Sequence, residues 1–136
     1  MWLKIFCDGG ARGNPGPAAS AFVVYNEAGE IVGKKGKYLG ETTNNVAEYR
    51  AVLEALTYLR ENFPENRELV RFFLDSQLVV NQLSGLWKIK DNTLRELVFR
   101  VHELENGLAI NYSYVPREKN QAADALVNTT LDEHLN

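Results

Sequence analysis

The segment at residues 69–74 constrains the fold of this 136-residue chain most strongly, because it is a nearly continuous apolar run. Such a run is typical of a β-strand that is covered on both of its faces. Its apolar character stops at Asp75, where polar residues begin. We therefore expect this segment to lie inside a sheet that has helices packed against it.

The rest of the chain supplies the other strands and the helices. Residues 2–7, 19–25 and 31–39 have strand character, and a Gly/Pro-rich loop at 11–17 and a turn at 26–30 separate them, which predicts an antiparallel meander. Helical spacing follows at Tyr49, Val52, Leu53, Leu56 and Leu59, and Pro64 ends that helix. Residues 76–83, 93–105 and 120–130 suggest further helices, and residues 109–115 a fifth strand. The predicted fold is α/β, a five-stranded mixed sheet with helices on both faces.

The length of the chain and its hydrophobic content of 45% indicate one compact domain spanning residues 1–136. A single cysteine, Cys7, cannot form an internal disulfide, and we find neither a leader peptide nor an apolar stretch of membrane-spanning length. We therefore expect a cytoplasmic protein without membrane association, with monomer as the default state. The net charge of −3 argues mildly against nucleic-acid binding through bulk positive charge.

Four carboxylates stand out by their positions. Asp8 and Asp75 lie where apolar strands give way to polar residues, and strand ends are where open α/β sheets usually bind ligands. Glu48 and Asp124 lie on or beside the apolar faces of predicted helices. Each has a purely structural alternative: a turn at Asp8, a helix cap at Asp75, a capping box from Asn45 to Glu48, and a solvated helix position at Asp124.

Taken together, the four carboxylates favour a metal site. A carboxylate packed against apolar surface needs a hydrogen-bonded partner or a metal ion. Four converging carboxylates would repel one another unless cations lay between them. Carboxylates together with substrate phosphate oxygens form the usual Mg²⁺ site, and two such ions can support in-line attack of water on phosphorus.

Four ordered sequence motifs resemble those of type 1 ribonuclease H, and they cover nearly the whole chain. They are Asp-Gly-Gly at residues 8–10 with Gly-Asn-Pro-Gly-Pro at 13–17, Thr-Thr-Asn-Asn at 42–45 with Glu48, Phe-Leu-Asp-Ser-Gln at 73–77, and the segment 116–126 that contains Asp124. The resemblance implies the ribonuclease H-like fold and cleavage of the RNA strand of RNA/DNA hybrids to 5′-phosphate and 3′-hydroxyl ends. It also implies two Mg²⁺ ions, with Mn²⁺ as a substitute, held by Asp8, Glu48, Asp75 and Asp124.

The same resemblance implies a set of substrate-binding residues. These are Gly9, Asn14, Thr43, Asn44, Asn45 and Gln77. Short amides and hydroxyls suit a protein that reads a hybrid through its backbone and minor groove. Thr43 would hold a DNA phosphate. Ordinary helix capping explains the asparagine pair equally well, and the two roles are compatible.

The sequence departs from the family pattern at two places. Many members carry a histidine in the loop before the last helix, whereas this loop offers Arg117 as a candidate catalytic substitute, with a solvated loop arginine as the alternative. The basic protrusion of some members is reduced to a short segment in which Trp87, beside Lys88 and Lys90, could stack on the DNA strand. Packing at a helix end is the alternative explanation for Trp87.

Three other functions compete with hybrid cleavage. A non-catalytic nucleic-acid-binding domain could keep the fold, but all four acidic positions are filled here. Double-stranded RNA is a second substrate to consider, because hybrids and A-form helices share minor-groove features. A DNA-directed nuclease of the wider superfamily is disfavoured by the form of the second motif.

Overall fold

The computed structural model describes residues 2–135, which form five strands, four α-helices and one 3₁₀ turn. The strands are β1 (Leu3–Ala11), β2 (Gly16–Tyr25), β3 (Ile31–Thr42), β4 (Val70–Leu74) and β5 (Ile110–Tyr114). The helices are α1 (Asn44–Asn62), α2 (Gln77–Leu83), α3 (Asn92–Leu104) and α4 (Gln121–Leu135), and the 3₁₀ turn η1 spans Arg117–Lys119.

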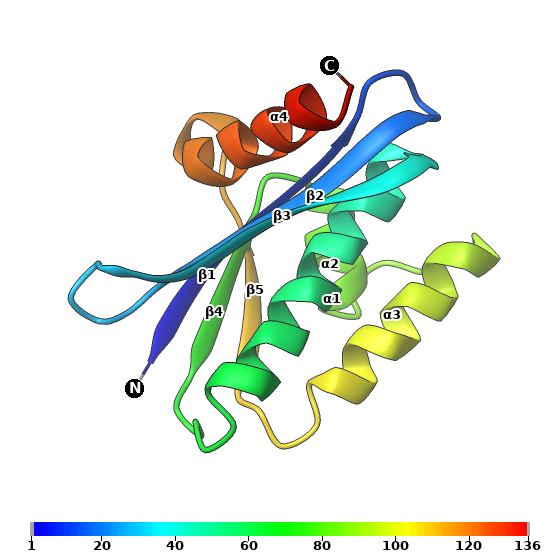
Figure 1. The fold of residues 1–136 in the computed structure, drawn as a ribbon. Helices are drawn as coiled ribbons and strands as arrows, with labels where there is room; N and C mark the ends of the chain where they lie inside the picture. The colour runs from blue at the N-terminus through cyan, green and yellow to red at the C-terminus, as the bar shows by residue number, and fades with distance from the viewer. Residues whose placement is uncertain (1, 136) are drawn as a thin grey trace.

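The five strands form one mixed sheet in the order β3-β2-β1-β4-β5. β1, β2 and β3 pair antiparallel, whereas β4 runs parallel to β1 and β5 runs parallel to β4. α1 packs on one face of the sheet with α3 against it, and α4 lies across β1, β2 and β3 on the other face (Figure 1). The predicted α/β fold, a five-stranded mixed sheet with helices on both faces, is confirmed.

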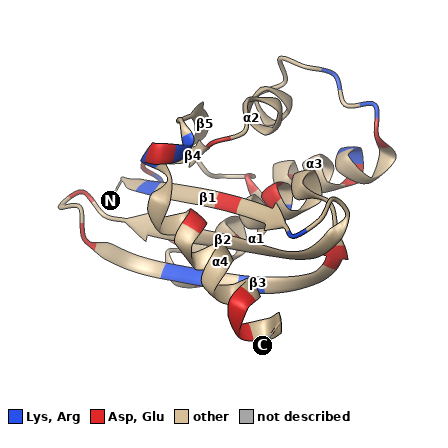
Figure 2. Ribbon diagram, turned by 90° about the horizontal axis from the view of Figure 1, so that it is seen from above, with Lys and Arg blue, Asp and Glu red and all other residues tan. Residues whose placement is uncertain are grey.

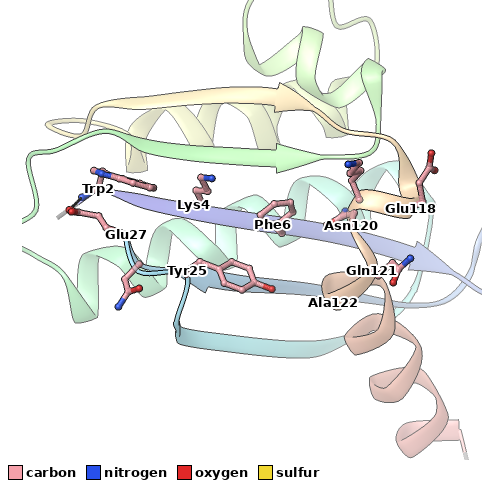
Figure 3. A pocket seen from close by; sticks show the side chains of 12 residues that line it. Trp2, Lys4, Phe6, Tyr25, Glu27, Glu118, Asn120, Gln121 and Ala122 are labelled. Atoms are coloured by element: carbon pink, nitrogen blue, oxygen red, sulfur yellow. Dashed lines mark hydrogen bonds between the residues drawn. The ribbon is translucent and has the colours of Figure 1, made fainter.

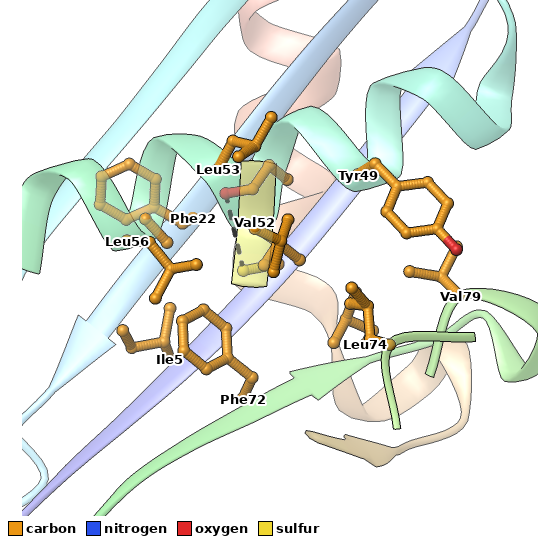
Figure 4. Packing of buried hydrophobic residues seen from close by; sticks show 14 of the residues in the cluster. Ile5, Phe22, Tyr49, Val52, Leu53, Leu56, Phe72, Leu74 and Val79 are labelled. Atoms are coloured by element: carbon orange, nitrogen blue, oxygen red, sulfur yellow. Dashed lines mark hydrogen bonds between the residues drawn. The ribbon is translucent and has the colours of Figure 1, made fainter. Parts of the chain in front are cut away.

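The main core lies between the sheet and α1, as Figure 4 shows. Every residue of the predicted helical stripe is buried there, because all of them face the apolar side of the sheet: Tyr49, Val52, Leu53, Leu56 and Leu59. A smaller cluster, Ala19, Ala21, Val127 and Leu131, lies beneath α4. Small alanine side chains on β2 let α4 approach this face of the sheet closely.

The expectation that β4 is covered on both faces is wrong. Val70, Phe72 and Leu74 face the core, but Arg71 is exposed and Phe73 is only half-buried on the opposite face. The reason is that α4 packs on β1, β2 and β3 and leaves the β4 side of its face open. There Phe73 stacks on Phe6 with ring centroids 4.8 Å apart, and the Arg71 guanidinium lies over the Phe73 ring.

Several element boundaries differ from the predicted ones. β1 does not stop before Asp8 but continues to Ala11, because pairing with β2 extends from Lys4–Tyr25 to Ala11–Ala18. The predicted loop at residues 11–17 therefore shortens, since β2 already begins at Gly16. α4 runs to Leu135, beyond the predicted end at residue 130. Among residues 2–135, every helix is too short or too polar to span a membrane.

Candidate active site

The four carboxylates predicted from the sequence line one pocket of about 440 Å³. Asp8 comes from β1, Glu48 from the second turn of α1, Asp75 from the residue after β4, and Asp124 from the first turn of α4. Arg117, the candidate substitute for the loop histidine, lines the same pocket. Residues far apart in the sequence thus meet at one end of the sheet, where α1 and α4 approach β1 from opposite faces (Figure 1).

Gly9 brings α1 against β1 beside Asp8. A Cβ atom at Gly9 would lie 2.3 Å from the backbone carbon of Ala47 and 2.4 Å from the backbone nitrogen of Glu48. Real Cβ atoms do not approach backbone so closely, so this strand and this helix can meet here only through a glycine. The contact sets the position of the Glu48 backbone relative to Asp8. Gly9 also lines the pocket, and its role in substrate binding stays a prediction.

The start of α1 is held by its own cap and by hydrogen bonds with the end of β1 and the β1–β2 loop. The Thr43 hydroxyl accepts from the backbone N–H of Val46 at 3.2 Å and caps the helix, so the alternative capping box from Asn45 to Glu48 is wrong. Asn44 Oδ1 accepts from the N–H of Ala11 at 2.8 Å, and the Asn44 N–H donates to Asn14 Oδ1 at 2.9 Å. Asn44 and Asn14 therefore both have a structural role.

Asp75 does not cap the helix that follows it. The Ser76 hydroxyl caps α2 by accepting from the N–H of Val79 at 3.2 Å. The Asp75 carboxylate instead faces the pocket and accepts from the side-chain amide of Asn120 at 3.2 Å. The structural alternative for Asp75 is therefore wrong.

Burial and mutual repulsion disfavour the charged forms of two carboxylates. Asp8, which is 8% exposed, has its pKa raised to about 8 by burial and then by the nearby charges of Asp75, Asp124 and Glu48. Burial raises the pKa of Glu48 to about 7, although a hydrogen bond with Ser76 and the charge of Arg117 act in the opposite direction. Without a cation, the pocket therefore disfavours having all four carboxylates charged at once.

Sequence reasoning missed one cation in the pocket. Arg12, from the β1–β2 loop, lines the pocket and pairs with Asp132 of α4 at 2.6 Å. Its guanidinium also contacts the carbonyl oxygen of Asn128 at 3.4 Å. The one available signal was a basic residue shortly after the Asp-Gly-Gly motif, and that signal does not reveal a partner 120 residues away.

The structure does not bring every predicted substrate-binding residue to the pocket. Asn45, Gln77 and Trp87 are absent from its lining, as are Thr43 and Asn14. Gln77 is exposed at the start of α2, and Trp87 is 49% exposed between α2 and α3. These residues could contact only a ligand that extends beyond the pocket, and their roles stay predictions.

The donor set suits a hard divalent cation. Carboxylate oxygens are the protein ligands that Mg²⁺ and Mn²⁺ prefer, and Mg²⁺ usually keeps several waters and takes substrate phosphates as further ligands. Within residues 2–135, no group of three or more His, Cys, Asp or Glu side chains is arranged so that it could by itself hold a metal ion. The charged forms of Asp8 and Glu48, which the fold disfavours, are the forms that a bound cation would stabilise.

The raised pKa values predict how stability depends on pH in the presence of EDTA. A carboxyl whose pKa is higher in the folded state stabilises the fold below its unfolded-state pKa, and this contribution is lost as pH rises through the folded-state pKa. We therefore expect the free energy of unfolding of Asp8→Asn to rise, relative to that of the wild type, by at least about 1 kcal/mol as the pH increases from 5 to 8. Thermal melts of both proteins across this range measure the difference.

Because both proteins contain His102, His134 and the other titratable groups, the effects of those groups on the pH dependence of stability cancel in the comparison. Adding Mg²⁺ at pH 8 should raise the Tm of the wild type more than that of Asp8→Asn, because the cation offsets the repulsion around Asp8. If the stabilities of the two proteins changed with pH in the same way in EDTA, the pKa of Asp8 would not be raised in the folded state.

Comparisons with known proteins agree with this geometry. Residues 6–130 match the family described as reverse transcriptase-like. Ribonuclease HI of Halobacterium salinarum is 42% identical over 132 residues, covering 96% of this chain and 65% of that protein. A bifunctional protein of Mycobacterium tuberculosis is 37% identical over 134 residues, covering 97% of this chain but 36% of its own length. The chain thus spans less than two thirds of either relative.

A solved structure matches over nearly the full length of both chains. LC11-RNase H1, determined in complex with an RNA/DNA hybrid, superposes with a TM-score of 0.95 at 39% identity and covers 98% of this chain and 99% of that one. That superposition agrees with the fold described above. The chain therefore belongs to the type 1 ribonuclease H family.

Proposed function

We propose that this chain, as a single domain of residues 1–136, is an endoribonuclease that hydrolyses the RNA strand of RNA/DNA hybrids. The products would carry 5′-phosphate and 3′-hydroxyl ends. The observation that carries the proposal is the convergence of Asp8, Glu48, Asp75 and Asp124 from four separate elements on one pocket. A matching structure, LC11-RNase H1, holds an RNA/DNA hybrid, which supports the choice of substrate.

The family is metal-dependent, and we infer two Mg²⁺ ions held by the four carboxylates, with Mn²⁺ as a substitute. When bound, such ions supply activation of a water molecule and neutralisation of charge on the attacked phosphate. The carboxylates of Asp8, Glu48, Asp75 and Asp124 would hold the ions. Arg117 adds a positive charge at the same pocket, where it would act on the scissile phosphate as a cation.

The residues around the pocket would position the hybrid. Asn44 and Gly9 line the pocket itself, so their polar groups would reach the nucleic-acid backbone beside the carboxylates. Thr43 and Asn45 flank Asn44 and would extend the contact along the start of α1. Outside the pocket, Asn14, Gln77 and Trp87 would contact more distant parts of the duplex, with the exposed Trp87 ring stacking on the DNA strand.

We further propose that the protein acts as a monomer in the cytoplasm. Cys7 is its one cysteine and is 1% exposed, so its thiol is shielded from pairing with another chain. Acidic and basic segments are interspersed over the ribbon in Figure 2. Binding would then depend on local groups at the pocket rather than on the overall charge of −3.

Parallel assays on three duplexes test the substrate class. Labelled RNA/DNA hybrid, double-stranded RNA and double-stranded DNA of one sequence are incubated with the protein and Mg²⁺. We expect cleavage of the hybrid, and products that a 5′-phosphate-dependent exonuclease can degrade. Cleavage of double-stranded DNA would contradict the proposal, and equal rates on hybrid and double-stranded RNA would widen the substrate class.

A further inference from the structure

We propose that Asn120 is a positioning residue that holds the Asp75 carboxylate in place and fixes the start of α4 against β1. The inference rests on the proposed function, since its consequence is the geometry of the carboxylate pocket. Asn120 follows η1 directly and precedes α4. It is 1% exposed, which is unusual for an asparagine outside regular structure.

The side-chain amide of Asn120 joins two elements that each carry a carboxylate. Its Nδ2 donates to the carbonyl oxygen of Cys7 at 2.8 Å and to Asp75 Oδ2 at 3.2 Å. Cys7 directly precedes Asp8 on β1. One NH₂ group therefore bonds both to the backbone beside the first carboxylate and to the third carboxylate itself.

The backbone of Asn120 extends the connection to Arg117 and Asp124. The Asn120 N–H donates to the carbonyl of Arg117 at 2.9 Å, and the N–H of Asp124 donates to the carbonyl of Asn120 at 3.1 Å. Through its side chain and its backbone, Asn120 thus links β1, Asp75, the turn with Arg117 and the helix with Asp124. The Asn120 side chain is thereby hydrogen-bonded both to β1 and to one of the four carboxylates.

At position 120 the side chain must donate two hydrogen bonds, one to Cys7 and one to Asp75. Pairing between β1 and β4 extends only to Phe6–Phe73, and the next carbonyl on β1, that of Cys7, accepts from Asn120. Rotating the amide by half a turn would place Oδ1 against two acceptors, so the orientation is determined by its neighbours. Oδ1 itself is buried and has no hydrogen-bond partner among the described residues. This position therefore uses the Nδ2 hydrogens of Asn120 and leaves its Oδ1 without a partner among the described residues.

Asn120 also lines a second pocket, of about 410 Å³, on the open part of the sheet. Figure 3 shows this pocket with Phe6 and Tyr25 on its floor and Asn120 at the end nearest Glu118. The Asn120 side chain thus contacts this open surface and Asp75 of the carboxylate pocket. Removing it would take away the hydrogen bond that restrains the Asp75 carboxylate.

Two substitutions separate hydrogen-bond donation from shape. Asn120→Ala removes the amide, and Asn120→Asp keeps the shape but replaces the donor with an acid beside Asp75. Tyr58→Phe is the matched control, because it removes a half-buried side-chain bond to the carbonyl of Val32 at 2.9 Å, far from the pocket. Rates are measured well below the Tm of every variant, so that the folded fractions are equal.

We expect both Asn120 variants to lose kcat by about 10- to 100-fold, with KM for the hybrid within about 3-fold of wild type and a higher Mg²⁺ concentration at half-maximal rate. A readout without catalysis is the Mg²⁺-induced rise in Tm, which should fall to less than half in Asn120→Ala and stay unchanged in Tyr58→Phe. Asn120→Gln, which keeps the donor on a longer side chain, should recover part of kcat.

The proposal is overturned if Asn120→Ala keeps kcat and the Mg²⁺-induced Tm rise at the level of Tyr58→Phe. A loss of stability alone, equal in the two variants, would leave Asn120 as an ordinary packing residue and would also overturn it. If the wild type itself cuts no hybrid, the proposed function fails, and the Tm measurement still decides the role of Asn120.

Discussion

Replacing Asp75 with asparagine is expected to abolish hybrid cleavage while the protein stays folded. The substitution removes a charge from the pocket but changes the side-chain volume little, and the new amide oxygen can still accept from Asn120. The loss should be at least about 10³-fold in kcat, or about 4 kcal/mol of transition-state stabilisation, because a metal-binding carboxylate acts directly on the reacting phosphate.

Single-turnover cleavage of a labelled hybrid, with thermal melts on the same samples, measures both parts of this expectation. Glu103→Gln is the control, since it makes the same chemical change on the exposed surface of α3. We expect that control to cleave at the wild-type rate. Near wild-type cleavage by Asp75→Asn would remove Asp75 from the catalytic set.

Gly9→Ala should have the second large effect, on stability and activity together. The added methyl group would meet the backbone of Ala47 and Glu48 at 2.3–2.4 Å, and backbone cannot move aside as a flexible side chain can. We expect a stability loss of about 3 kcal/mol or more, at the upper end for overpacked sites. Displacing Glu48 by about 1 Å from Asp8 should also lower kcat on the order of 100-fold.

Urea denaturation measures the stability part, with Gly10→Ala as its control. A Cβ atom at Gly10 would lie 3.6 Å from Val127 Cγ1, which is an ordinary van der Waals distance. Gly10→Ala should therefore cost far less stability than Gly9→Ala, although both change neighbouring glycines of one motif. Equal losses in the two variants would contradict the close approach of α1 to β1.

The fold and the four carboxylates could be predicted because their signals are local. The stripe from Tyr49 to Leu59 has helical spacing in the sequence, and it is buried as that spacing requires. The order of strands and helices limited the topology to a mixed sheet. The four carboxylates belong to short motifs, and each motif can be read without knowing what lies next to it in space.

The features that sequence reasoning missed depend on long-range contacts. β1 extends past Asp8 because β2 pairs with it there, and a Gly-Gly pair in isolation predicts a turn. The open face of β4 depends on where α4 packs. Asn120 bonds to Cys7, 113 residues earlier, and Arg12 pairs with Asp132, 120 residues later. Each of these contacts requires the assembled sheet.

Cleavage of an end-labelled RNA/DNA hybrid with Mg²⁺ and with EDTA, beside single-stranded RNA of the same sequence, tests the central claim most directly. The convergence of Asp8, Glu48, Asp75 and Asp124 predicts cutting of the hybrid only when Mg²⁺ is present, and no cutting of single-stranded RNA. Hybrid that is bound but left intact at every Mg²⁺ concentration would contradict the account and would indicate a nucleic-acid-binding domain without catalysis.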